Sequence, residues 1–269
     1  MSKKIKFIKE LLGHLIPHNL KNRIIKKKLK RIESKINPSN TQHKVIANLC
    51  RGNCIEIGAL SSPGWFPFAK KIIYADIQSS EEAKKSLEKL GYFGYHKNEF
   101  VDVSILFDPQ KPPLSKIPSN SVDCIYSSHS LEHSPNPISA LIDYIRVIKK
   151  DGIVYSIIPN KEYTYDKNRK STNIDYLINK YQNNLWSYEI NEYRDVFMNT
   201  DNHDVYNNKS EKDIMNAYKE NTGHHHIYVY DEMNTLQLIN FVLKKTTTKI
   251  IYFDSTNKND IHFAIKKTQ

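Results

Sequence analysis

Two carboxylates stand at the ends of apolar segments, at a spacing that suits the binding of a nucleoside. Glu56 lies within the apolar segment 54–57, and Gly58 follows in the turn. Twenty residues after Glu56, a second apolar segment ends in Asp76. A glycine in the turn lets a ligand lie against bare backbone, and a carboxylate after the next strand accepts hydrogen bonds from both ribose hydroxyls. Glu56 itself would suit a cofactor that carries a cationic amino group.

The first turn differs from the fingerprint of a dinucleotide-binding site. That fingerprint needs three glycines in a short loop, whereas the segment 58–63 contains one. A nicotinamide or flavin cofactor is therefore not indicated. A further acid, Asp102, ends the apolar segment 100–103 and could face an adenine, although Asp108 competes for that role and either acid could only cap a turn. Asp76, taken alone, could equally be a surface residue at the end of a strand.

Short apolar segments alternate with helical segments between residues 53 and 158, which is typical of a parallel sheet with crossover helices. Strands are predicted at 53–57, 71–76, 100–103, 122–127 and 152–158, and helices at 81–90 and 138–149. Pro137 suits the first turn of the second helix, and Asp151 and Gly152 supply its stop. The predicted fold class is α/β, a Rossmann-like three-layer sandwich with a mostly parallel, seven-stranded sheet.

The chain changes in character after Pro159. Residues 160–223 are polar and rich in Tyr, Asn and Asp, and we expect them to form an acceptor-side insertion or lid. The segment 224–230 then alternates like a strand, and 233–243 has helical periodicity. A closing hairpin is predicted from 249–253 and 261–265. These elements predict one domain over residues 41–269.

The basic charge is concentrated at the amino terminus. The formal net charge is +11, and residues 1–36 hold twelve Lys or Arg and two Glu, which leaves 28 basic and 27 acidic residues in the rest. We expect residues 1–40 to form a basic helical extension that contacts an anionic membrane surface or a lipid-linked glycan peripherally through 1–36. The alternative is a solvated helical pair docked on the domain. Because the rest of the chain is nearly neutral, nucleic acid is not the favoured partner.

Composition places the chain among folded proteins of the cytoplasm, with a peripheral position on the inner membrane as an alternative. Hydrophobic residues make up 39% of the sequence, and no apolar run approaches the roughly 20 residues that span a bilayer. The amino terminus lacks the apolar core of a secretory signal. The three cysteines, Cys50, Cys54 and Cys124, have no metal-ligand spacing and are predicted to lie in the core.

The most specific stretch follows the fourth predicted strand. It contains Ser-Val-Asp-Cys-Ile-Tyr-Ser-Ser-His-Ser-Leu-Glu-His at 121–133 and Arg-Val-Ile-Lys-Lys-Asp-Gly at 146–152. This stretch resembles class I S-adenosylmethionine-dependent methyltransferases, in which the fourth strand leads into His-x-Leu-Glu-His and the next helix ends in Arg-Val-Leu-Lys-Pro-Gly-Gly. Ile148 and Asp151 are mild departures. Together with the two acidic strand ends, the resemblance covers about residues 45–160.

The resemblance implies S-adenosylmethionine as the cofactor and a place for each matching residue. Glu56 and the turn after it would surround the methionine part, Asp76 would bind the ribose, Asp102 would face the adenine, and 127–129 would lie below the sulfonium. The implied cofactor-binding residues are Glu56, Gly58, Ala59, Leu60, Asp76, Ile77, Asp102, Val103, Ser127 and His129. Ser-Ser-Pro at 61–63 replaces the later glycines of the family's loop, so the path of that loop is open.

A narrower resemblance concerns the acceptor. The segment 157–169 is similar to Pro-Asp-Lys-Arg-Tyr-Thr-Phe-Asp-x-x-Arg in a subgroup that also has Gly-Ala-x-x-x-Pro in its first loop and a late His-x-His strand, matched here by 58–63 and 224–226. This subgroup is associated with the biosynthesis of surface polysaccharides such as capsule. The resemblance therefore implies a saccharide, an activated sugar or a related glycan precursor as acceptor, and O-methylation as the reaction.

Histidines are the candidate bases for removing the acceptor proton, because imidazole titrates near neutral pH. His226 or His224 is predicted to be the base, and His129 and His133 are rivals. The predicted acceptor-binding residues are His133, Tyr163, Asp166, Arg169 and Tyr228. On a strand, residues 224, 226, 228 and 230 would share one face. The alternative is that these histidines only satisfy local hydrogen bonds. No metal is predicted, and ligation by the histidine cluster is the less favoured possibility.

Three classes of function remain open. The first is the methyltransferase acting on a small molecule or glycan. The second is a protein or nucleic-acid methyltransferase that uses residues 1–36 for recognition. The third is a non-catalytic homologue that binds the cofactor and has lost transfer.

Overall fold

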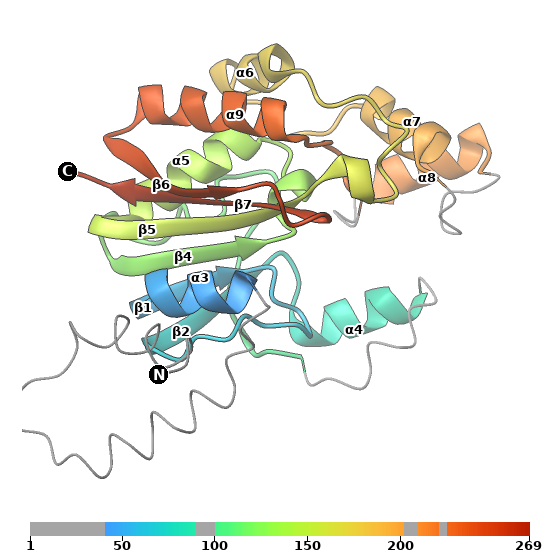
Figure 1. Cartoon of the computed structure of the whole chain (residues 1–269). Coiled ribbons are helices and arrows are strands. Elements are labelled where there is room, and N and C mark those ends of the chain that lie inside the picture. The colour runs from blue at the N-terminus through green and yellow to red at the C-terminus, as the bar shows by residue number, and fades with distance from the viewer. Residues whose placement is uncertain (1–40, 90–99, 202–208, 221–224) are drawn as a thin grey trace, which may run out of the picture.

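The computed structural model describes residues 41–89, 100–201, 209–220 and 225–269 (Figure 1). The predicted basic extension over 1–40 and the candidate base His224 lie outside these residues. The described part contains a seven-stranded sheet with helices on its faces. The predicted fold class is thereby confirmed.

The sheet reverses its strand order next to the first strand. Its strands are β1 (Gly52–Ile57), β2 (Ala69–Asp76), β3 (Val103–Leu106), β4 (Val122–Ser128), β5 (Ile148–Pro159), β6 (Thr248–Asp254) and β7 (Asp260–Lys267). Their order is β3-β2-β1-β4-β5-β7-β6, and β7 runs antiparallel to the other six strands. The chain moves outward from β1 to β3 and returns to β4 on the other side of β1. Ligands of open α/β sheets bind at the carboxyl ends of the strands at such a switch point.

Helices cover both faces of the sheet. They are α3 (Thr41–Leu49), α4 (Ser80–Lys89), α5 (Pro137–Val147), α6 (Ile174–Gln182), α7 (Ile190–Asn199), α8 (Glu211–Glu220) and α9 (Glu232–Lys245), with short 3-10 helices η2 (Leu131–His133) and η3 (Lys161–Tyr163). Figure 1 shows α5, α6 and α9 over one face, α3 over the other, and α7 with α8 beyond the carboxyl ends of β4 and β5. Within the described ranges, no helix combines the length and apolar character needed to cross a bilayer.

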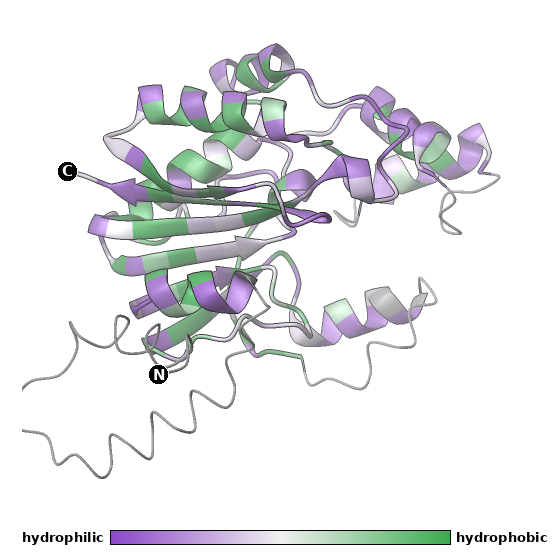
Figure 2. Cartoon of the chain, in the orientation of Figure 1, coloured by the Kyte–Doolittle hydropathy of each residue, from purple (hydrophilic) through white to green (hydrophobic). Residues whose placement is uncertain are grey.

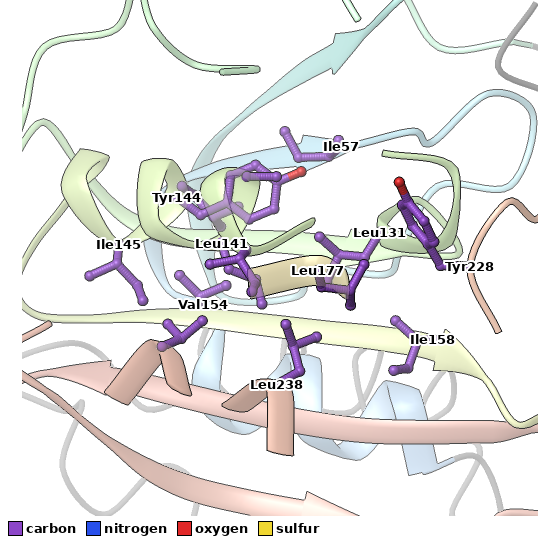
Figure 3. Close-up of a cluster of buried hydrophobic side chains, with 14 of the residues drawn as sticks. Ile57, Leu131, Leu141, Tyr144, Ile145, Val154, Ile158, Leu177, Tyr228 and Leu238 are labelled. Carbon is purple, nitrogen blue, oxygen red and sulfur yellow. The ribbon is translucent and has the colours of Figure 1, made fainter. Parts of the chain in front are cut away.

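The core follows from strand alternation. Ile55, Ile125 and Val154 point to the face under α5 and α9 and belong to the larger buried cluster, part of which is drawn in Figure 3. Their neighbours Cys54 and Cys124 lie in the smaller cluster under α3. Figure 2 shows hydrophobic residues both in the central strands and in α3, α5 and α9, which cover them. Because both faces are covered, the central strands are apolar on both sides.

The first residue of α5, the helix that follows the turn after β4, is determined by a local capping interaction. The side chain of Asn136 accepts a hydrogen bond of 3.1 Å from the N–H of Ser139, and Pro137 occupies the first turn. An amide cap and a proline at this place both favour the first turn of a helix. The helix ends at Val147, and β5 begins at the next residue. The predicted helix at 138–149 is therefore confirmed, with an end two residues earlier.

Two strand predictions are wrong in position or kind. The third strand is β3 at Val103–Leu106 rather than 100–103, so Asp102 precedes this strand instead of ending it. Residues 225–230 form no strand. Their backbone pairs with segments outside the sheet: the N–H groups of Ile227 and Tyr228 both donate to the carbonyl of Glu132, in η2, at 3.0 and 3.1 Å. All six of these residues are buried, so alternation in the sequence did not correspond to one exposed face.

The segment 160–223, expected as an insertion, holds η3, α6, α7 and α8 in its described residues. A buried lysine joins two of these helices to the segment 225–230. The ammonium of Lys180, in a side chain that is 1% exposed, donates to Glu192 Oε1 at 2.8 Å, to Tyr228 Oη at 2.7 Å and to the carbonyl of Ser187 at 3.0 Å. Three partners satisfy all three ammonium protons. The network was not visible in the sequence pattern.

Replacement of this lysine by methionine should therefore destabilise the protein. Lys180→Met leaves the Glu192 carboxylate buried without its cation, and we expect the free energy of unfolding to fall by about 3 kcal/mol. The matched control is Lys85→Met, because Lys85 pairs with Glu81 at 2.8 Å while its side chain is 70% exposed; that change should leave the stability almost unaltered. Urea unfolding followed by circular dichroism measures both, and equal losses would contradict the structural role of Lys180.

Candidate active site

The carboxyl end of β1 presents a buried acid with one oxygen lacking a hydrogen bond. The side chain of Glu56 is 2% exposed, and its Oε1 accepts a hydrogen bond of 2.8 Å from the N–H of Gly64. Among the described residues, its Oε2 has no hydrogen-bond partner. Burial raises the pKa of Glu56 to about 7, against the opposing effect of the Gly64 N–H. An oxygen of this kind is suited to a cationic ligand group.

The turn after β1 is packed against the turn after β4. Gly58 has a φ of +73°, its N–H donates to the carbonyl of Ala75 at 3.0 Å, and a Cβ at this position would lie 3.3 Å from Cβ of Ser130. Leu60 also has a positive φ, of 45°, and its carbonyl accepts from the N–H of Val101 at 3.0 Å. A glycine is required where backbone takes the left-handed region in so close a space. The turns after β1, β2 and β4 thus meet at one edge.

The second predicted acid ends β2 at the same edge. Asp76 is buried, and its Oδ1 accepts a hydrogen bond of 2.7 Å from the N–H of Ile77. Burial raises the pKa of Asp76, while the N–H groups of Ile77 and Gln78 oppose this rise. Glu56 and Asp76 therefore lie at the carboxyl ends of paired strands, as expected for residues that bind the amino acid and ribose parts of one cofactor.

The acid predicted to face the adenine does not lie at the end of a strand. Asp102 is exposed and lies before β3. The carbonyl of Asp76 accepts a hydrogen bond of 3.1 Å from the N–H of Phe107, so Asp108 is the acid that follows the carboxyl end of β3. Asp108 is exposed and pairs with Lys111 at 2.9 Å. An adenine contact through Asp102 remains a prediction, without the strand-end position that motivated it.

On the other side of the switch point, the turn after β4 carries His129. This residue has a φ of 49°, and its N–H donates to the carbonyl of Ile157 at 3.0 Å. Its Nε2 lies 3.0 Å from Asp260 Oδ1, and its Nδ1 lies 3.6 Å from Glu132 Oε1. The side chain is 44% exposed. The ring is therefore accessible from outside, while its backbone is held in a strained conformation that needs its neighbours to maintain it.

Three imidazoles surround Glu132, whose side chain has 0% exposure. The distances from its Oε1 are 3.6 Å to Nδ1 of His129, 3.7 Å to Nε2 of His133 and 3.8 Å to Nε2 of His226. Neither carboxylate oxygen has a hydrogen-bond partner among the described residues. Burial raises the pKa of Glu132, and the nearby charges of His226 and His129 oppose this rise.

The predicted base His226 is held from behind by an acid. Its Nδ1 lies 2.7 Å from Asp166 Oδ2, and its ring stacks on that of Tyr165 with centroids 4.7 Å apart. Burial would raise the pKa of Asp166, but hydrogen bonds and charge from His226 and Arg169 hold it below its usual value. Asp166 therefore fixes the ring so that Nε2 faces Glu132.

The remaining predicted acceptor residues have other surroundings. Arg169 is 1% exposed; it bonds to Asp166 Oδ1 at 2.7 Å, to Asp195 Oδ2 at 2.8 Å and to the carbonyls of His226 and Ile227. Tyr228 is buried in the Lys180 network. Neither is therefore placed to touch an acceptor: Arg169 positions the 226–227 backbone, and Tyr228 is part of the core. Tyr163 is exposed, and His133 is half-buried beside His226.

Sequence reasoning gave no role to two acids of this site. Glu132 stood inside the His-Ser-Leu-Glu-His stretch, so its place between two histidines was an available signal. Asp260 begins β7 and is far from His129 in the chain. No local pattern could have paired these two residues.

Comparison with known proteins supplies the class of enzyme. Residues 64–156 match the family model described as a methyltransferase domain. The chain contains a methyltransferase domain. The match confirms the predicted S-adenosylmethionine-dependent methyltransferase, and nothing in it bears on the acceptor or on a role in polysaccharide synthesis.

Similar solved structures include an S-adenosylmethionine-dependent methyltransferase from Aquifex aeolicus, with 14% identity, 88% of this chain and 97% of that chain covered, and a TM-score of 0.42. Another is an S-adenosylmethionine-dependent methyltransferase from Mesorhizobium loti, with 10% identity, 84% of this chain and 95% of that chain covered, and a TM-score of 0.47. A structure described as a putative methyltransferase from Bacillus halodurans is also similar, with 11% identity, 84% of this chain and 97% of that chain covered, and a TM-score of 0.45. No curated protein matches the chain. These likenesses are distant, with sequence identities of 10–14%.

The residues at the β1 and β2 ends fit the cofactor. S-adenosylmethionine carries a cationic amino group and a ribose, and the unpaired oxygen of Glu56 and the strand-end Asp76 offer acceptors for both. The cofactor supplies a methyl group on a sulfonium. Ala59 and Ser127 are buried beside these acids, in the turn after β1 and at the end of β4.

The raised pKa of Glu56 predicts a pH-dependent stability for the methyltransferase without cofactor. Between the ordinary value of 4.5 and about 7, the folded chain keeps the proton and the unfolded chain loses it, so the free energy of unfolding falls as pH rises through this window. Glu56→Gln removes the effect. Between pH 4.5 and pH 8, the free energy of unfolding of the parent should fall by about 3 kcal/mol relative to that of Glu56→Gln. Urea unfolding at both pH values measures it, and parallel profiles would contradict the buried, unpaired state.

Proposed function

We propose that this methyltransferase transfers a methyl group to a hydroxyl of a saccharide, an activated sugar or a related glycan precursor. The observation that carries the proposal is the cluster of Glu132, His129 and His226 beside the turn after β4. It lies across the switch point from Glu56 and Asp76, on the side where an acceptor would meet the cofactor. Such a cluster can lower the pKa of a hydroxyl or take its proton, which is the help that O-methylation needs.

Different residues of the chain bind the cofactor and contact the acceptor. Glu56, Asp76 and the Gly58 turn hold and orient the cofactor, and His129 stands at the boundary between cofactor and acceptor. The His226 Nε2 faces Glu132 because Asp166 holds Nδ1 at 2.7 Å. The acceptor oxygen then needs to lie in line with the sulfonium methyl, a requirement met by positioning alone.

The nature of the acceptor is supported by two features. The described domain carries polar, hydrogen-bonding groups at the acceptor side, including the exposed hydroxyl-bearing ring of Tyr163 and the half-exposed His129. The stretch 157–169 resembles the glycan-associated subgroup. The near-neutral charge outside residues 1–36 does not favour a nucleic-acid acceptor. A peripheral contact between residues 1–36 and a membrane or a lipid-linked glycan is part of the proposal.

The split between binding and transfer tests this assignment. His226→Ala should reduce methyl transfer by about 10²–10⁴-fold while leaving the affinity for S-adenosylhomocysteine within twofold. Glu56→Gln should instead weaken that affinity. Calorimetry measures binding, and mass spectrometry of candidate glycans and nucleotide sugars measures the gain of one methyl group.

The control variant is Asp151→Asn, because Asp151 is exposed at the opposite end of β5, where it pairs with Lys266. It should keep both affinity and transfer. Methylation of RNA or protein but of no saccharide would overturn the acceptor assignment. Cofactor binding without any product would favour the non-catalytic alternative.

A further inference from the structure

Three side chains at the acceptor side bring potential metal ligands together. One ligand atom from each of His129, Glu132 and His226 lies within 4.8 Å of the others. The separations from Glu132 Oε1 are 3.6 Å to His129 Nδ1 and 3.8 Å to His226 Nε2. Ligands bound to one ion at about 2.1 Å stand roughly 3.0–3.6 Å apart at angles of 90–120°. The two distances from Glu132 need to shorten by at most a few tenths of an ångström, and the two imidazole nitrogens, which lie within 4.8 Å of each other, need to approach by up to about 1 Å to share an ion.

The carboxylate at the centre lacks the bonds that a purely structural acid would have. Ionised Glu with protonated His pairs at about 2.7–2.9 Å, but the three imidazole nitrogens remain at 3.6–3.8 Å. Both oxygens of Glu132 are buried without a hydrogen-bond partner among the described residues. A buried carboxylate in this state costs several kcal/mol. Its surroundings therefore call for a positively charged occupant between the acid and the imidazoles.

The far side of each histidine ring has the arrangement of a metal ligand. His226 Nδ1 lies 2.7 Å from Asp166 Oδ2, and His129 Nε2 lies 3.0 Å from Asp260 Oδ1. Metal-ligating histidines almost always donate their second ring N–H to such a carboxylate, which fixes the tautomer and turns the lone pair of the other nitrogen toward the ion. Here both lone pairs then point toward Glu132. Two independent carboxylates thus orient both rings for the same centre.

We propose that His129 Nδ1, Glu132 Oε1 and His226 Nε2 bind one divalent transition-metal ion. Two imidazoles and one carboxylate suit Zn²⁺, Fe²⁺ or Mn²⁺, whereas Mg²⁺ and Ca²⁺ prefer sites made of oxygen atoms. Three protein ligands leave a coordination position open for a water or an acceptor. The partial exposure of His129 gives that position access from outside.

Resting on the proposed function, the site also assigns a role in transfer. An acceptor hydroxyl on the ion has a lowered pKa and loses its proton to solvent. The acceptor oxygen then forms the bond to the methyl carbon, the sulfur–carbon bond breaks, and its electron pair stays on sulfur. His226 is in this case a ligand rather than the base that the sequence predicted.

Metal binding to the full chain can be measured without any acceptor. The protein is treated with a chelator, and Zn²⁺, Mn²⁺, Co²⁺, Mg²⁺ or Ca²⁺ is added in turn. We expect about one Zn²⁺ per chain by elemental analysis, a metal-dependent rise in Tm for the transition ions, and visible absorption of Co²⁺ bound by nitrogen and oxygen. Mg²⁺ and Ca²⁺ should have little effect.

Variants locate the ion. Glu132→Gln has nearly the same shape as the parent and should abolish the Tm rise without lowering the stability of the metal-free protein, because it removes an unpaired buried charge. Asp166→Asn should weaken Zn²⁺ binding by about 10–100-fold. His43→Gln is the control, because His43 lies on α3 beside Trp65 and should retain the metal.

The outcomes separate this inference from the proposed function. Absence of stoichiometric metal in the parent, or equal Zn²⁺ affinity in the parent and Glu132→Gln, would overturn the metal site. Full methylation of a saccharide by metal-free enzyme would overturn its role in transfer and leave the proposed function standing. Tight metal binding with no methylated saccharide would instead leave the site standing and count against the acceptor. If Glu132→Gln fails to fold, the Co²⁺ spectrum of the parent decides.

Discussion

The site depends on one buried residue, Glu132, whose backbone carbonyl and side-chain carboxylate make different contacts. The carbonyl of Glu132 accepts the N–H groups of Ile227 and Tyr228, so the turn after β4 and the late segment 225–230 are joined at a single residue. The same residue places its carboxylate among three imidazoles, where neither oxygen has a hydrogen-bond partner in the part of the chain that the structure describes. Because such burial is costly, the surrounding structure must be rigid enough to prevent the acid from turning toward solvent.

Much of that rigidity comes from the segment 160–223. Arg169 holds the carbonyls of His226 and Ile227 and also the carboxylate of Asp166. Lys180 holds the Tyr228 hydroxyl from α6. Both cations are buried, and each pairs with a carboxylate and makes further hydrogen bonds, which is the condition under which buried charge can be retained. In the described residues, this segment therefore supports His226 from behind and orients its ring.

Two unpaired acids lie on opposite sides of the strand reversal. Among the described residues, one oxygen of Glu56, near the end of β1, and both oxygens of Glu132, after β4, have no hydrogen-bond partner. Each lowers the stability of the protein alone, and each is placed where a positive group would offset that cost: the cofactor's amino group at one, and the proposed metal ion at the other. Sites that bind charged ligands commonly keep such strain in the free protein.

The sequence alone determined the α/β class, the order of the elements and the class of enzyme. The fold follows from local physics: short continuous apolar runs form β1, β4 and β5, which are covered on both faces, and a capped helical period forms α5. The class of enzyme was indicated by the resemblance of the His-Ser-Leu-Glu-His stretch and of the acidic strand ends to one family.

Only the tertiary structure decided which polar residues meet. Alternation at 224–230 predicted a strand with one polar face, yet its described residues, 225–230, are buried on both sides, and their backbone pairs with η2 and with other segments outside the sheet. Arg169 and Tyr228 were predicted to bind the acceptor because, apart from Asp166, the partners that hold them lie tens of residues away in the chain. Asp260 reaches His129 across 131 positions. Contacts of this kind depend on packing between distant elements, and packing leaves no period in the chain.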